Sequence, residues 1–227
     1  MLRQPWEAEC AVLLLDLDGT LVDSTEAVLR GWHAWARSIG VPTAGLESLV
    51  IGRSAASAIT TLLPDVTAEQ LRRHIDYVLT VQEHDSTPAF PMRGAGSLVG
   101  QLEATQWAVV TGCSLGMAYA RLAAGGLPRP RVLVTDEDVA SGKPDPGGYL
   151  LALRRLGIDA TDAIAVEDSP AGIMAARAAG IRTVAVATTH RQEALSAADV
   201  VASHLGKIRV TEAAGRRQVT VYGEARP

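Results

Sequence analysis

The chain has 227 residues, of which 48% are apolar, so it can bury a full core as one large domain or as one domain with an insert. Its formal net charge of −4 provides no basic surface for nucleic acid or for an acidic membrane, and we expect neither as a partner. Two cysteines, Cys10 and Cys113, are too few for a disulfide framework or a thiolate metal cage. With only a short apolar run near its start, the chain is expected to be a cytoplasmic protein and a monomer.

The first informative segment is the apolar run at 11–15, which ends at the sequence Asp-Leu-Asp-Gly-Thr at 16–20. The run predicts a buried strand, and a tight turn at Gly19 would bring the carboxylates of Asp16 and Asp18 together. Two like charges so close are costly unless a cation or a shared proton joins them. The pattern therefore predicts a hard metal ion, with an ordinary turn after a strand as the alternative.

Residues 22–89 interrupt the strands, because they read as three or four helices with no strand between them. We predict an inserted small α-helical cap at 22–89 and an α/β core domain formed by 1–21 and 90–227. Two neighbouring crossings would connect the cap to the core and could act as a hinge.

From residue 90 onward, short aliphatic runs alternate with segments of helical spacing. The runs lie at 107–110, 131–134, 163–166 and 183–186, and the helical segments lie at 95–102, 115–123, 146–156 and 171–179. This alternation predicts a Rossmann-like parallel sheet with helices on both faces and a ligand at the carboxyl ends of the strands. Residues 208–222 predict an added hairpin without a catalytic role.

Further polar residues follow the later strands. Glu167 and Asp168 come after the run at 163–166, where they either cap the next helix or complete a magnesium shell with Asp16 and the backbone carbonyl of Asp18. Thr111 follows the run at 107–110, so we expect its hydroxyl at the same rim of the sheet.

Lys143 lies between Gly142 and Pro144, in a chain whose 21 Lys and Arg residues include only two lysines. A lysine in a chain that otherwise uses arginine suggests a chemical role that arginine cannot fill. The compact charge of its ammonium group suits an interaction with a phosphoryl oxygen. A solvated loop lysine is the alternative.

In order and placement, these residues resemble the four motifs of the haloacid dehalogenase superfamily of phosphohydrolases. The motifs correspond to 16–20, Thr111, Lys143 with Pro144, and Glu167 with Asp168, and the helical insert resembles the small α-helical cap of that superfamily. The segments at 142–146, 149–150, 167–172 and 188–189 are closest to the sugar-phosphate and glycerol-3-phosphate phosphatases, to which the β-phosphoglucomutases are related.

The resemblance implies a Mg²⁺-dependent phosphatase acting on small phosphate monoesters of sugars or polyols. Asp16 would attack phosphorus and form an aspartyl-phosphate, while Asp18 would protonate the leaving alcohol and later deprotonate the attacking water. Asp16, Asp18 and Asp168 would hold the ion, and Glu167 would bind it directly or through water.

The remaining site residues are expected to bind substrate. Thr111 and Lys143 would hold phosphoryl oxygens. Because Gly112 stands where relatives often have serine, one phosphate contact is either missing or supplied by backbone amides. Arg53 is the candidate for a substrate contact from the cap, with a solvated residue at a helix start as the alternative. Ile51 occupies a position where relatives often have histidine, so their substrate preference does not carry over.

Three other functions fit parts of the sequence. A phosphosugar mutase of the β-phosphoglucomutase type would return the phosphate to a sugar, a choice that depends on cap geometry. The Gly-x-Ser-x-Gly pattern at 112–116 matches the nucleophile elbow of a serine hydrolase but leaves Asp16, Asp18 and Lys143 without a role. A non-catalytic binding protein on this fold would have little reason to keep every reactive group.

Overall fold

The computed structural model describes residues 4–51, 55–85, 89–213 and 216–225. Its centre is a seven-stranded sheet with the order β12-β9-β8-β7-β2-β5-β6. All of its pairings are parallel except that of β12 with β9. The strands are β2 (Val12–Leu15), β5 (Trp107–Val110), β6 (Leu133–Val134), β7 (Ala163–Glu167), β8 (Arg182–Val186), β9 (Val200–Ala202) and β12 (Glu224–Ala225). The predicted α/β class with a parallel sheet is confirmed.

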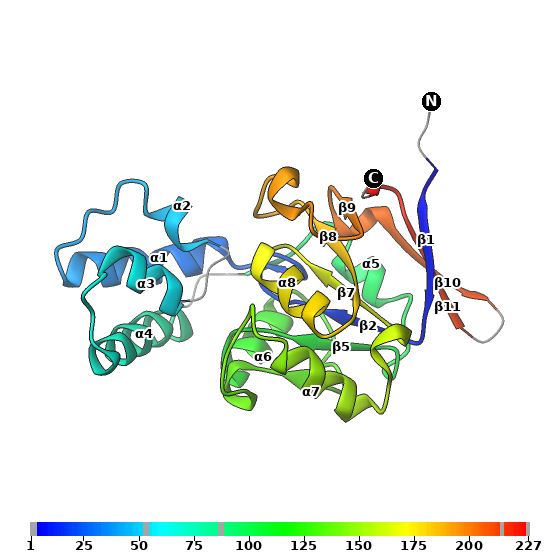
Figure 1. Cartoon of the computed structure of the whole chain (residues 1–227), viewed down its shortest axis with the longest axis horizontal. Coiled ribbons are helices and arrows are strands. Elements are labelled where there is room, and N and C mark those ends of the chain that lie inside the picture. The colour runs from blue at the N-terminus through cyan, green and yellow to red at the C-terminus, as the bar shows by residue number, and fades with distance from the viewer. Residues whose placement is uncertain (1–3, 52–54, 86–88, 214–215, 226–227) are drawn as a thin grey trace.

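Helices cover both faces of this sheet (Figure 1). They are α5 (Ala95–Val99), α6 (Leu115–Ala124), α7 (Gly147–Leu156) and α8 (Pro170–Ala178). Alternate residues of β2 point to opposite faces. Leu13 and Leu15 pack in the cluster that includes α5 and α6, whereas Val12 and Leu14 pack in the cluster that includes α7 and α8. The site-bearing strand β2 is therefore buried on both faces.

A second sheet of three antiparallel strands packs on the cluster that includes α5 and α6. Its strands are β1 (Trp6–Cys10), β11 (Arg216–Val221) and β10 (Ile208–Ala213), in that order. The predicted C-terminal hairpin corresponds to β10 and β11, and the sequence analysis did not predict that β1 would extend it. Buried side chains such as Cys10 and Val219 anchor this sheet to the core.

Four helices form a separate bundle at the opposite end of the molecule from the three-stranded sheet (Figure 1). They are α1 (Thr25–Ser38), α2 (Leu46–Val50), α3 (Ala55–Leu62) and α4 (Ala68–Glu83). They share a hydrophobic cluster of their own, in which Trp32 and Trp35 meet edge to face with ring centroids 5.4 Å apart. The Trp35 indole also donates a hydrogen bond of 3.1 Å to His74 Nδ1.

The chain passes between the two parts through a short antiparallel ribbon of β3 (Val22–Asp23) and β4 (Phe90–Pro91). The two crossings therefore lie side by side, as a hinge would require. The division into a core at 1–21 and 90–227 and a cap at 22–89 stays a prediction. The described residues also include four short 3₁₀ helices, at Asp136–Asp138, Ala160–Asp162, Gln192–Leu195 and Leu205–Lys207. Within the described residues, none of the helices has the length and apolar character that a membrane crossing requires.

Candidate active site

Three neighbouring strands bring the candidate catalytic residues to one edge of the sheet. Strand β2 lies between β5 and β7, and Leu15 is in register with Val109 and Val166. Asp16 follows β2, and its backbone N–H continues the ladder by donating to the carbonyl of Val166. Thr111 follows β5, and Asp168 follows β7. Residues that are far apart in the sequence therefore lie next to one another at this edge of the sheet.

Lys143 connects the carboxylates of Asp16 and Glu167. Its ammonium group lies 2.6 Å from Asp16 Oδ1 and 2.5 Å from Glu167 Oε1, and it also donates to the carbonyl of Val110 at 3.1 Å. The Tyr149 hydroxyl donates to the same Glu167 oxygen at 2.7 Å. Burial alone would lower the pKa of Lys143, but Asp16 and Glu167 outweigh it and raise this pKa well above its ordinary value. Lys143 therefore stays charged inside the site.

The carboxylate of Asp16 is buried and only half satisfied. Its Oδ1 accepts from Lys143, whereas its Oδ2 is buried and accepts no hydrogen bond from the described residues. Burial is the main cause that raises the pKa of Asp16 to about 7, with Glu167 adding to the rise and Lys143 opposing it. Leaving a buried oxygen without a donor costs free energy. Such an oxygen is expected where a cation or a reacting atom binds.

Asp16, Glu167 and Asp168 each offer one oxygen, and these oxygens lie within 4.8 Å of one another. Burial first, and then the neighbouring charges of Asp16 and Glu167, raise the pKa of Asp168 well above its ordinary value. A cation between the carboxylates would relieve this repulsion, and carboxylate oxygens are the ligands that Mg²⁺ prefers. The residues present therefore fit a divalent metal ion.

The three acids differ in how free they are to bind an ion. Glu167 Oε1 already accepts from Lys143 and Tyr149, and its Oε2 accepts from the Asp168 backbone N–H and the Ser169 hydroxyl at 3.3 and 3.2 Å. Asp16 and Asp168 are consequently the better candidates for direct ligands. Whether Glu167 binds the ion directly or through water stays a prediction.

Asp18 lies outside this cluster of side chains. Its Oδ1 accepts a hydrogen bond of 2.6 Å from the Ser24 hydroxyl, and its Oδ2 forms an ion pair with Arg121. A metal contact from its backbone carbonyl, as the sequence predicts, stays a prediction. Gly19 adopts φ 82°, and a Cβ there would lie 2.2 Å from Asp168 Oδ2. Only glycine therefore allows this turn to approach the carboxylate so closely.

The predicted phosphate-binding residues lie at the same edge. The Thr111 hydroxyl is buried and donates to Cys113 Sγ while it accepts from the Cys113 backbone N–H, both at 3.3 Å. Gly112, the next residue, lines the cavity directly. Arg53, the predicted cap contact, lies outside the described residues, while Ile51 does line the cavity.

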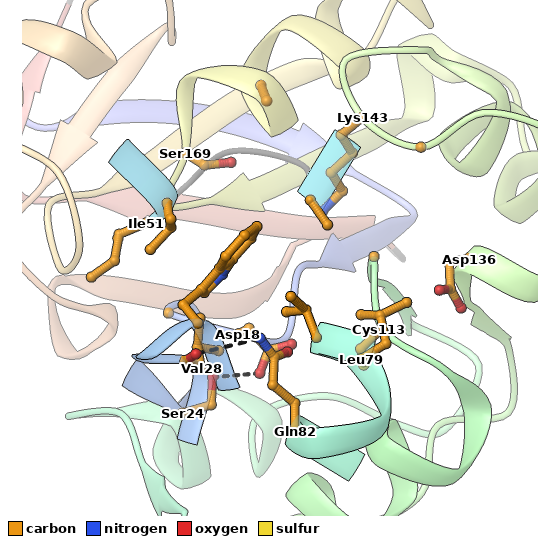
Figure 2. A pocket seen from close by; sticks show the side chains of 18 of the residues that line it. Asp18, Ser24, Val28, Ile51, Leu79, Gln82, Cys113, Asp136, Lys143 and Ser169 are labelled. Atoms are coloured by element: carbon orange, nitrogen blue, oxygen red, sulfur yellow. Dashed lines mark hydrogen bonds between the residues drawn. The ribbon is translucent and has the colours of Figure 1, made fainter. Parts of the chain in front are cut away.

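A cavity of about 390 Å³ lies between the helical bundle and the strand ends. The core contributes charged groups, including Asp18, Lys143 and Asp168, as Figure 2 shows for the first two. The bundle contributes an apolar wall on which Gln82 supplies a polar side chain (Figure 2); the described wall includes Val28, Trp32, Ile75, Leu79 and Gln82. The volume is in the range of a small-molecule site.

Sequence reasoning missed Ser24, Arg121 and Gln82. Arg121 left a signal, because it shares a face of a predicted helix with apolar residues. The predicted serine-hydrolase elbow has a structural explanation: the Ser114 hydroxyl accepts from the Met117 backbone N–H and caps α6. In the described part of the chain, no hydrogen bond joins Ser114 to a histidine.

A parallel α/β core whose strand ends gather a lysine and three carboxylates beneath a helical bundle defines a hydrolytic enzyme. The sequence matches the family described as haloacid dehalogenase-like hydrolase over residues 13–186. The chain belongs to this family.

Characterised relatives are similar over most of the chain. Hexitol phosphatase A of Escherichia coli is 37% identical over 89% of this chain and 95% of its own length. Validoxylamine A 7'-phosphate phosphatase of Streptomyces hygroscopicus is also 37% identical, over 87% of this chain and 95% of its own. The crystal structure of a hydrolase from Pseudomonas syringae has the same fold, with a TM-score of 0.76 at 24% identity over 86% of this chain and 94% of that chain.

Proposed function

We propose that this chain is a Mg²⁺-dependent phosphatase that hydrolyses small sugar or polyol phosphates through an aspartyl-phosphate on Asp16. The chain is a phosphoric monoester hydrolase, because it belongs to the haloacid dehalogenase-like hydrolases and its close relatives are phosphatases. The observation that carries the proposal is Asp16 itself. One of its oxygens is fixed by Lys143, and the other is buried at the strand edge, where no residue that the structure describes donates to it.

Each side chain has a defined part in the first half-reaction. Asp16 attacks phosphorus, forming an O–P bond as the bond to the leaving oxygen breaks, and Asp18 gives its proton to that oxygen. Lys143 holds Asp16 in place, and its positive charge lies where the phosphoryl oxygens gather negative charge. The backbone N–H of Gly112 supplies a further donor, and the Thr111 hydroxyl would supply another by turning its hydrogen from Cys113 Sγ to the phosphate.

The second half-reaction reverses the proton movement. Asp18 takes a proton from water, which attacks the aspartyl-phosphate and releases phosphate from Asp16. Mg²⁺, held by Asp16 and Asp168, would offset the repulsion between the Asp16 carboxylate and the substrate dianion. Glu167 positions Lys143 through its short ion pair.

The cavity suggests the size and character of the substrate. It has room for a sugar or polyol, and the apolar wall of the bundle would exclude water from the ester during the first half-reaction. Hexitol phosphatase A and the glycerol-1-phosphate phosphohydrolases of yeast are relatives whose names indicate substrates of this kind. We propose that the cap at 22–89 closes over the core to complete the site. A cytoplasmic location and a monomeric state stay predictions.

The test is a phosphate-release screen with a panel of hexitol, hexose, deoxyhexose and glycerol phosphates, with and without Mg²⁺. The proposal expects Mg²⁺-dependent release from at least one of these esters and no interconversion of glucose phosphate isomers. Isomer conversion in place of release would make the chain a mutase. Turnover of none of the esters, with Mg²⁺ present, would contradict the proposal.

A further inference from the structure

Arg121 occupies an unusual position for an arginine. It lies on the face of α6 that packs into the core, together with Met117, Ala118 and Leu122, and its side chain is only 7% exposed. Burying a guanidinium is costly unless it is paired, and a helix position of this kind is normally apolar. The position therefore requires an explanation that packing alone does not supply.

The partner of Arg121 is Asp18. The Nη1 group donates to Asp18 Oδ2, and within the described residues the rest of the guanidinium has no hydrogen-bond partner. Arg121 also lines the cavity between the bundle and the core. An arginine has five N–H donors, and its contact with Asp18 uses only one of its nitrogens. The guanidinium and the carboxylate that it holds therefore both border the space that the substrate would occupy.

Asp18 is held from both sides. Ser24, the residue that precedes α1 of the bundle, donates to Oδ1 at 2.6 Å, and Arg121 from the core donates to Oδ2. Figure 2 shows Ser24 and Asp18 joined in this way at the edge of the pocket, with Gln82 beside them. With both oxygens engaged, the orientation of the carboxyl group is fixed by residues from two different parts of the fold.

We propose that Arg121 is a positioning residue that holds the carboxyl group of Asp18 in line with the leaving oxygen of the substrate. This inference rests on the proposed phosphatase function. In the step concerned, Asp18 carries its proton on Oδ1, the oxygen that Arg121 does not hold, and this proton moves to the bridging oxygen as the P–O bond breaks. Arg121 neither gives nor takes a proton. Its contribution is the geometry of that transfer, which a displacement of about 1 Å would impair.

The consequence is a dependence on the leaving group. An alkyl ester leaves as a strongly basic alkoxide and needs the proton, whereas p-nitrophenol leaves readily without it. Misplacing Asp18 should therefore slow the hydrolysis of an alkyl phosphate far more than that of p-nitrophenyl phosphate. General damage to the fold or to the phosphate site would slow both.

The experiment compares Arg121→Met with the wild-type enzyme in Mg²⁺, using the best alkyl ester of the screen and p-nitrophenyl phosphate. We expect kcat to fall about 100-fold for the alkyl ester and less than about 10-fold for the aryl ester, from the usual size of general acid catalysis. The inhibition constant of inorganic phosphate should not change. Arg121→Lys, which keeps a cationic donor, should recover part of the alkyl activity.

Two further variants separate positioning from structure. Leu122→Ala creates a cavity on the same buried face of α6 and should lower stability without changing the ratio of the two kcat values. Ser24→Ala removes the other donor to Asp18 and should shift the ratio in the same direction as Arg121→Met. If Arg121→Met does not fold, Arg121→Lys and Ser24→Ala carry the same comparison.

An equal loss on both esters in Arg121→Met, or an unchanged alkyl activity, would overturn the inference and leave the phosphatase function standing. If the wild-type enzyme hydrolyses neither ester in Mg²⁺, the proposed function fails and the inference fails with it.

Discussion

The Lys143 ammonium group lies 2.6 Å from Asp16 Oδ1, although 127 positions separate the two residues in the chain. The same ammonium group contacts Glu167 at 2.5 Å, so one cation serves two carboxylates at the edge of the sheet. Lys143 therefore fixes Oδ1 of Asp16, and Oδ2 remains available to react with the substrate or to bind the metal ion.

Replacing Lys143 should damage both activity and stability. Lys143→Met would leave Glu167, which is fully buried, without its positive partner, a loss that typically costs about 3–5 kcal/mol. It would also remove a charge near the developing phosphoryl negative charge, so we expect kcat to fall by about 100-fold or more. Urea unfolding and phosphate release measure the two effects.

Lys143→Arg tests the chemical reason for a lysine. A planar guanidinium is larger than an ammonium and cannot take its place among Asp16, Glu167 and the Val110 carbonyl without moving them. The variant should stay charged yet remain strongly impaired in kcat. Activity close to the wild-type value would show that a point charge is not required.

Tyr149→Phe should separate stability from catalysis. The Tyr149 hydroxyl donates to Glu167 Oε1 at 2.7 Å, and a hydrogen bond to a charged group contributes about 1.5–3 kcal/mol. Because Lys143 still contacts Glu167, we expect a loss of stability in that range with a smaller effect on kcat than in Lys143→Met. An unchanged urea midpoint would contradict the role given to the hydroxyl.

Gly19→Ala should impair the metal site through a direct clash. The new Cβ would lie 2.2 Å from Asp168 Oδ2 at a φ of 82°, so Asp168 would have to move. We expect weaker Mg²⁺ binding by calorimetry together with a lower kcat.

The matched control is Gly40→Ala, which also has a positive φ, of 73°, but whose new Cβ has no described atom within 4 Å apart from its chain neighbours. It should lose stability, by about 1 kcal/mol, without any change in Mg²⁺ affinity. Equal Mg²⁺ affinities in the two variants would mean that the position of Asp168 does not matter for the ion.

Removing the metal should silence the enzyme reversibly. With Asp16, Glu167 and Asp168 clustered, an anionic ester would approach a strongly negative site in the absence of a cation. Excess chelator should abolish phosphate release, and added Mg²⁺ should restore it. Asp168→Asn should require a higher Mg²⁺ concentration for half-maximal activity. Full activity in excess chelator would exclude the metal site.

Much of the fold was predictable because the hydrophobic pattern of each segment agrees with the strand or helix that the segment forms in the whole structure. The apolar run before Asp16 and the alternation after residue 90 predicted β2, β5, β7 and β8, together with four core helices close to their observed bounds. Strand β1 was missed, although the alternation of Trp6, Ala8 and Cys10 with two glutamates has the period of a strand. Its pairing partner, β11, lies more than 200 residues away, which a local pattern cannot indicate.

The candidate site was predictable where a motif ends a strand, and not where side chains meet across the fold. The position of Asp16 and Asp168 follows from the order of parallel strands. The ion pair of Arg121 with Asp18 spans 103 positions and joins a helix to a turn, so sequence spacing could not predict it. An arginine on a helix normally indicates a solvated face, and only its apolar neighbours at helical spacing suggested otherwise.

The most direct test of the account is to trap the enzyme during turnover with borohydride, which reduces an aspartyl-phosphate to homoserine, and to locate the change by mass spectrometry. With Mg²⁺ and a good substrate, homoserine should appear at position 16 in the wild-type enzyme and not in Asp16→Asn, which should also release no phosphate. An active enzyme that carries no homoserine at position 16, or an active Asp16→Asn variant, would contradict the account.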